Sequence, residues 1–290
     1  MAIVLGILMI MGLIWSLQRN RDRRGQVPAS GAADPGLPSG EYDGKPIPHG
    51  QLPLGRIDVR GLTKKYGVVV VDDVSFTAEP GRVTGFLGPN GAGKTTTLRM
   101  LLGLVEPSAG SAEIGGARYI HLEQPILRVG AVLEASAAHE GRTGRDHLRV
   151  LCRAAGLPMS RADEVLATVG LARVGGRRVR AYSLGMRQRL GVAAALLGDP
   201  QVLILDEPGN GLDPAGIRWI RSLLRSLAAS GRTVLVSSHQ LAEVEQLADD
   251  LVVIAAGRVV ASGPLASVVG SHAGLEEPFL ELTAGTEGIR

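Results

Sequence analysis

The stretch from Gly88 to Thr96, which reads Gly-Pro-Asn-Gly-Ala-Gly-Lys-Thr-Thr, has the residue types and the spacing to bind phosphate. Glycine, four residues and then Gly-Lys-Thr leave successive backbone N–H groups free to turn inward around an anion. Lys94 can reach the β and γ phosphates of a nucleotide, and the Thr95 hydroxyl can ligate magnesium. The spacing therefore predicts a phosphate-binding loop.

Two acidic residues follow an apolar run further along the chain. Asp206 ends the run that begins at Gln201, and Glu207 comes directly after it. An aspartate at a strand end can hold magnesium, usually through water, and an adjacent glutamate can orient or deprotonate an attacking water. At a second place, Ser183 and Gly185 stand at a predicted helix start, where they can present a hydroxyl and bare backbone to an anion. Together these residues point to nucleotide hydrolysis.

The elements that must position this chemistry are those of an α/β domain. An apolar strand at 83–87 precedes the loop and a helix at 97–102 follows it, which is the context that a phosphate-binding loop needs. Strands at 201–206, 233–237 and 251–254 are apolar on both faces, as in a parallel sheet covered by helices, here at 217–227 and 240–248. We also expect strands at 56–60, 68–71, 74–78, 111–114 and 129–133. A helical pattern covers 143–170, with Ser160 to Asp163 resembling a capping box.

The N-terminal region has a different composition. Residues 2–17 are almost all apolar, and Arg19, Arg21, Arg23 and Arg24 follow. Sixteen helical residues reach roughly 24 Å, against a bilayer core of about 30 Å, so residues 1–18 are a short candidate membrane anchor with the arginines on the cytoplasmic side. The positive charge follows the apolar run, which argues against a cleaved secretion signal. The other interpretation is that these residues come from an upstream start of translation and are no working part of the protein. Residues 19–55 are predicted to be a basic, Pro/Gly-rich linker.

Composition excludes few functions. A net charge of +3 in 290 residues is too small to indicate nucleic-acid binding by itself. Cys152 is the only cysteine, so the chain can form no internal disulfide, which suits a reducing compartment. No Cys/His cluster has zinc spacing.

Five or six motifs in order resemble the ATP-binding subunit of an ABC transporter, from about Arg56 to the end. They are the phosphate loop, the signature-like Tyr182-Ser-Leu-Gly-Met186, Asp206-Glu-Pro208, Gly211-Leu-Asp-Pro214, and His239 after its apolar strand. The usual signature is Leu-Ser-Gly-Gly-Gln, and Tyr, Leu and Met replace three of its residues here. Such variants resemble the export branch related to drug and bacitracin resistance.

The resemblance implies a P-loop, ABC-type ATPase with a mixed sheet core, an antiparallel β subdomain and a helical subdomain. It implies ATP and Mg²⁺ as ligands, Glu207 and His239 as catalytic residues, and adenine stacking on Tyr66. The implied ATP-binding residues are Tyr66, Gly88, Pro89, Asn90, Gly91, Ala92, Gly93, Lys94, Thr95 and Thr96. Ser183 and Gly185 would contact the ATP of a partner subunit, Asp213 would lie in the loop that crosses the dimer, and Thr95, Glu134 and Asp206 would hold the metal.

One position departs from the family. Glu134 stands where glutamine is usual at the end of the strand after the phosphate helix. Both side chains offer an oxygen to magnesium, but glutamate adds a charge and loses an amide donor. The departure leaves open how residue 134 senses the γ-phosphate.

The resemblance also implies partners and boundaries. The ATPase domain is expected at 56–283, with a helical lobe at about 135–180 and a tail at 284–290. No long apolar run follows residue 17, so a separate integral membrane permease would form the transport path. We expect a second ATPase subunit, most simply in a homodimer, no nucleic acid, and a position on the cytoplasmic face of the membrane. Two alternatives stay open: a soluble ABC ATPase that acts on ribosomes or nucleic acid, and an ATP-binding regulator without turnover.

Overall fold

The computed structural model describes residues 55–133 and 138–284. The predicted anchor, almost all of the linker, the end of the tail and Glu134 lie outside these residues. Within them, no helix combines the length and the apolar character needed to cross a bilayer. The described residues form two compact units, one of residues 55–133 with 198–284 and one of residues 138–197.

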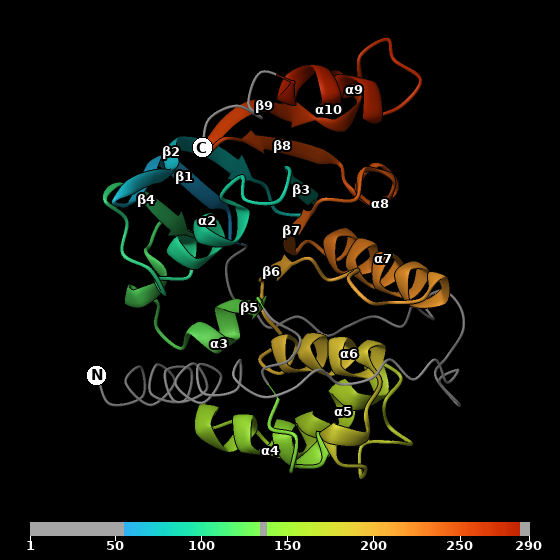
Figure 1. Cartoon of the computed structure of the whole chain (residues 1–290). Coiled ribbons are helices and arrows are strands. Elements are labelled where there is room, and N and C mark those ends of the chain that lie inside the picture. Colours follow the sequence, from blue (N-terminus) through green and yellow to red (C-terminus); the bar gives the residue numbers. More distant parts are fainter. Residues whose placement is uncertain (1–54, 134–137, 285–290) are drawn as a thin grey trace. The chain divides into compact units, whose positions relative to one another are not determined.

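A six-stranded sheet forms the centre of the larger unit (Figure 1). Its order is β5 (Val129–Val132), β6 (Val202–Asp206), β7 (Thr233–Ser238), β3 (Val83–Leu87), β8 (Asp250–Ala255) and β9 (Arg258–Pro264). The first five strands are parallel and β9 is antiparallel to β8. β3, β6 and β7 are buried throughout, as their largely apolar sequences predict. The sheet confirms the predicted parallel strands and adds β9 at one edge.

Helices cover both faces of this sheet. Phe86 packs in the cluster that contains α2 (Lys94–Leu101), whereas the next residue, Leu87, packs with α8 (Leu241–Leu247). This alternation is expected because successive strand side chains point to opposite faces. α7 (Pro214–Ala229) and α8 lie on the face opposite to α2 (Figure 1). Because β3 and β6 both pair parallel with β7, the carboxyl ends of the three strands lie at one edge of the sheet, where the candidate site lies.

A three-stranded antiparallel sheet packs on α2, in the order β2 (Val68–Ala78), β1 (Ile57–Tyr66) and β4 (Ala109–Ile114). The prediction of two separate strands at 68–71 and 74–78 is wrong, because they form the single strand β2. Asp73 adopts a left-handed conformation with φ 54°, and the pairing with β1 shifts register nearby. Such a bulge lets polar residues interrupt the pattern without ending the strand.

Short elements complete the larger unit. They are the 3-10 turn η1 (Tyr119–His121), α3 (Pro125–Arg128), α9 (Leu265–Val269) and α10 (Glu276–Thr283). Leu275, which precedes α10, packs in the same cluster as Leu87 and α8. The C-terminal helices therefore extend the core on the α8 side.

The smaller unit is helical, with α4 (Gly144–Ala155), α5 (Ser160–Thr168), η3 (Val179–Ala181) and α6 (Leu184–Ala195). The predicted pattern over 143–170 is divided after α4 because Gly156 ends that helix in a left-handed conformation. The unit extends beyond residue 180, since α6 belongs to it.

The capping box predicted at Ser160 is wrong. Ser160 lies inside α5, whose N-cap is Met159 without a side-chain hydrogen bond, and Asp163 accepts instead from Arg145 at 2.6 Å. A side-chain cap forms one helix earlier, where Thr143 accepts from the N–H of Asp146 at 3.0 Å. The stretches from Thr143 to Asp146 and from Ser160 to Asp163 have the same capping spacing in sequence. Only the first forms a side-chain cap, because Arg145 binds the carboxylate of Asp163.

Candidate nucleotide-binding and catalytic site

The glycine-rich loop connects β3 to α2, and its glycines answer specific steric demands. Gly93 is the N-cap of α2 with φ 103°, a conformation that L side chains rarely adopt. A Cβ added at Gly88 would lie 2.2 Å from the carbonyl oxygen of Ile254. Pro89, Asn90 and Gly91 are exposed, whereas Ala92 is buried. The loop thus presents its tip to solvent while its two ends are fixed against the core.

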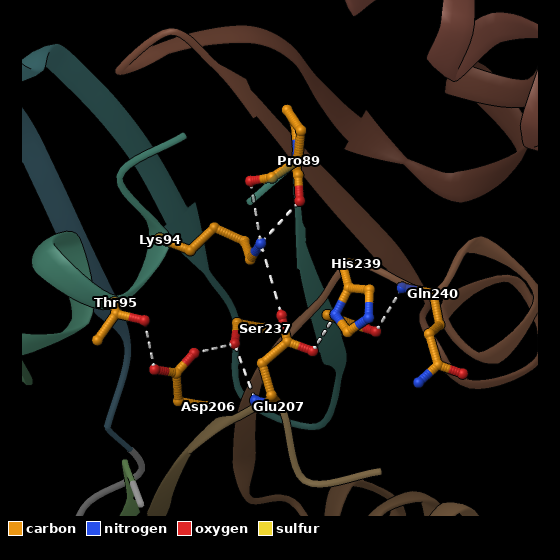
Figure 2. A network of polar contacts seen from close by, with 10 residues as sticks. Pro89, Lys94, Thr95, Asp206, Glu207, Ser237, His239 and Gln240 are labelled. Atoms are coloured by element: carbon orange, nitrogen blue, oxygen red, sulfur yellow. Dashed lines mark hydrogen bonds and ion pairs between the residues drawn. The ribbon is translucent and has the colours of Figure 1, made fainter. Parts of the chain in front are cut away.

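Lys94 links this loop to the acidic end of β6 (Figure 2). Its side chain is buried, and Nζ donates to the carbonyl oxygens of Gly88 at 2.7 Å and Pro89 at 3.3 Å. The same ammonium lies 3.5 Å from Oε1 of Glu207. A buried cation held at the loop is the group that a phosphate chain requires.

Thr95 and Asp206 meet although 111 residues separate them. Thr95 Oγ1 donates to Oδ2 of Asp206 at 2.7 Å, and the hydroxyl of Ser237 donates to the other carboxylate oxygen (Figure 2). Hydroxyl and carboxylate oxygens are the ligands that magnesium prefers, so these residues fit the implied ion. Thr96 is half-buried one position further along α2.

Glu207 and His239 form a second pair, in which Oε2 of Glu207 lies 2.7 Å from Nδ1 of His239 (Figure 2). The backbone of Glu207 has φ 51°, which is strained for a residue with a side chain. Its N–H donates to the backbone oxygen and to the hydroxyl of Ser237, at 3.2 and 3.0 Å. Ser237 therefore positions both acids at the end of β6, Asp206 through its carboxylate and Glu207 through its N–H.

Sequence reasoning missed Ser237 and Ser238 as site residues. Ser238 accepts from the N–H of Gln240 at 2.9 Å, which shapes the turn that carries His239. A usable signal was present, because two serines end an otherwise apolar strand immediately before the histidine. No such signal marks Glu243, which lies in the first turn of α8.

Tyr66 lies at the end of β1 and is 56% exposed, with the ammonium of Lys64 4.9 Å from its ring centre. An exposed aromatic ring can stack on a base.

Asp213 is the N-cap of α7 and accepts from the N–H of Gly216 at 2.7 Å. That capping bond gives Asp213 a structural task in this chain.

The signature-like residues lie in the helical unit. Ser183 is the N-cap of α6 and accepts from the N–H of Met186 at 3.2 Å, and Gly185 follows in the first turn. Tyr182 is buried within that unit, where its hydroxyl donates to the carbonyl of Val174 at 3.0 Å. The predicted helix start is confirmed, and Tyr182 serves packing.

A parallel sheet with a phosphate-binding loop after β3 and acidic residues at the end of β6 defines the chain as a P-loop nucleoside triphosphatase. Residues 71–210 match the ABC transporter family. The bacitracin transport ATP-binding protein BcrA of Bacillus licheniformis is 44% identical over 212 residues, which are 72% of this chain and 69% of that protein. The daunorubicin resistance ATP-binding protein DrrA3 of Streptomyces coeruleorubidus is 42% identical over 213 residues, 71% of this chain and 67% of that protein.

A solved structure described as the ATP binding subunit of an ABC transporter superposes with a TM-score of 0.71 at 31% identity, covering 78% of this chain and 98% of that one. The chain belongs to the ABC transporter family, as an ATP-binding subunit that hydrolyses ATP. The expected family and fold are therefore confirmed, and the ribosome or nucleic-acid alternative is not favoured.

Proposed function

We propose that this subunit powers the export of a small molecule through a separate membrane permease. The relatives named for bacitracin transport and daunorubicin resistance support the direction and the class of cargo. The observation that carries the catalytic part is the contact of Glu207 with His239, 2.7 Å apart and beside the buried Lys94. A carboxylate that could act as a base thus lies next to a cation that could bind phosphate, which supports this proposal.

ATP would bind with its phosphates on the loop from Gly88 to Thr96 and its adenine on the exposed ring of Tyr66. Lys94 would turn from the loop carbonyls to the β and γ phosphates. Thr95 and Asp206, with Glu134, would hold magnesium, which when bound would neutralise phosphate charge.

Glu207 would take a proton from the attacking water, because its Oε2 already contacts an imidazole that can orient it. His239 would hold Glu207 in place and, with its other ring nitrogen, approach the γ-phosphate. The strained backbone of Glu207 supports this assignment, since such strain gathers at catalytic positions.

The second ATPase subunit would be another copy of this chain. Ser183 and Gly185 of each copy would cap the ATP held by the other, and the loop at Asp213 would cross between them. ATP contacts that exist only in the closed dimer would favour closure, and hydrolysis would release it.

A mixing experiment tests this composite site. Lys94→Ala and Ser183→Ala chains should each be nearly inactive alone, because every site then lacks one half. In a mixed dimer one site combines Lys94 of one chain with Ser183 of the other, so an equimolar mixture should regain about a quarter of wild-type ATPase activity: half of the dimers are mixed and each retains one of two sites. No regain in mixtures shown to exchange subunits would contradict the shared site.

The permease would hold the subunit on the cytoplasmic face of the membrane, and residues 1–18 would add an anchor. The ATPase domain would cover 56–283, with the helical lobe meeting the permease.

Pull-down of the tagged full-length chain from membranes in mild detergent, followed by mass spectrometry, should recover a multi-spanning membrane protein in near-equal amount. Recovery of ribosomal proteins instead would overturn the proposal. Deleting residues 1–18 should leave this partner bound but reduce membrane retention when the permease is absent.

A further inference from the structure

Glu243 lies in the first turn of α8, four residues after His239, and its carboxylate rests against Gly209, two residues after Glu207. A Cβ added at Gly209 would lie 2.4 Å from Oε2 of Glu243 and 3.1 Å from its Cδ and Oε1. The backbone of Gly209 is outside the left-handed region. A side chain at this position would therefore have to displace the carboxyl group of Glu243, whereas the backbone conformation itself would accept one.

The environment of this carboxylate is unusual. Oε1 of Glu243 is buried and accepts no hydrogen bond from any group in the described residues. Glu243 lines a small cavity of about 30 Å³, whose other lining residues include Pro208, Gly209, Ile220 and Leu224. Burial raises the pKa of Glu243, the Glu207 carboxylate raises it further, and His239 lowers it. A buried polar atom without a partner costs free energy, so the position carries a local penalty.

The contact joins the two segments that carry the catalytic pair. Glu207 begins the segment that leaves β6 for α7, and His239 begins the segment that leaves β7 for α8. Their side chains meet at the sheet edge, and Glu243 and Gly209 meet again beyond it. Two contacts between the same segments define their relative position better than one.

We propose that Glu243 is a positioning residue for ATP hydrolysis, which sets the segment after Glu207 against the segment after His239 by packing its carboxyl group on Gly209. Within the described residues its Oε1 accepts no hydrogen bond from the phosphate loop, Thr95 or Asp206, and it would act through the Glu207–His239 pair. The inference rests on the proposed catalytic roles of that pair. A displacement of Glu207 by a fraction of an ångström would lower turnover without weakening the binding of ATP, because Lys94 and the loop hold the phosphates.

The test compares four variants of the full-length chain. Gly209→Ala introduces a methyl group that displaces the carboxyl group, and Glu243→Ala removes the contact. Each should lower kcat about tenfold, while KM and the Kd for ATP stay within about twofold. Glu243→Gln keeps the length and the contact, and should retain at least about half of wild-type kcat. The double variant Gly209→Ala/Glu243→Ala puts the new methyl group into the vacated space, so its loss should be far smaller than the product of the single losses.

The matched control is Glu245→Ala on the same helix, whose carboxylate faces Gly274, and it should leave kcat unchanged. Three results would each overturn the inference. They are a wild-type kcat in both single alanine variants, equal losses of kcat in Glu243→Gln and Glu243→Ala, and a loss in the double variant equal to the product of the single losses. Circular dichroism of every variant separates misfolding from loss of turnover. Glu207→Gln, measured in parallel, separates a failure of the proposed catalytic role of Glu207 from a failure of the positioning role of Glu243. Normal turnover in Glu207→Gln would refute the catalytic role. An inactive Glu207→Gln, together with unaffected Glu243 and Gly209 variants, would refute only the positioning role.

Discussion

Replacing Glu207 with glutamine is expected to lower the kcat of ATP hydrolysis by about a hundredfold or more, while ATP still binds. Glutamine keeps the size of the side chain and can still hydrogen-bond to His239, but it cannot take a proton from water. General-base catalysis contributes about 10²–10⁴-fold to a rate, which sets the expected loss. Single-turnover hydrolysis of ATP and titration with a fluorescent nucleotide measure the two quantities separately.

The control for this substitution is Glu245→Gln, which removes one carboxylate from α8 away from the catalytic pair and should turn over normally. The Glu207 variant should also accumulate the closed dimer in the presence of ATP, because in the proposed cycle closure would need ATP and opening would need hydrolysis. Turnover near the wild-type rate in Glu207→Gln would refute the assignment of Glu207 as the base.

Replacing Lys94 with alanine is expected to weaken ATP binding about thirtyfold or more. The buried ammonium contacts two loop carbonyls and lies 3.5 Å from Glu207, so it is held where the phosphates would lie. Truncating one partner of a buried, hydrogen-bonded charge pair costs about 2–5 kcal/mol, and 2 kcal/mol is about thirtyfold in Kd. Isothermal titration with ATP and magnesium measures the change.

The matched control is Lys65→Ala, which removes an exposed lysine at the end of β1 and should leave the Kd for ATP within about twofold. Because Lys94 also lies beside Glu207, its removal should abolish turnover even at saturating ATP. Tight ATP binding in Lys94→Ala would contradict the placement of the phosphates on this loop.

The phosphate-binding loop could be predicted from sequence because its chemistry is local. Nine consecutive residues supply the glycines, the cation and the hydroxyl, and the flanking strand and helix are continuous with them. The buried strands could be predicted for a similar reason, since runs such as Val202 to Leu205 are apolar throughout. Motif order then indicated the family, which the comparisons confirmed.

Local signals failed where a side chain had two possible partners. The Asp72-Asp73 pair interrupts an apolar run as a turn would, but in the structure it forms a bulge within β2. Ser160 and Asp163 have the spacing of a cap, but Arg145 takes the carboxylate. In both cases a tertiary contact decides: the pairing of β2 with β1 shapes the bulge, and Arg145 on another helix binds the carboxylate of Asp163.

The sequence by itself determined that the chain binds a nucleotide, which fold it adopts and which acids stand at strand ends. Only the tertiary structure decided which of these residues meet. Parallel pairing of β3 and β6 with β7 brings Thr95 to Asp206, and Glu207 to His239, across separations of 111 and 32 residues. The contact of Glu243 with Gly209 arises in the same way, because α7 and α8 start from neighbouring strand ends and pack on one face of the sheet.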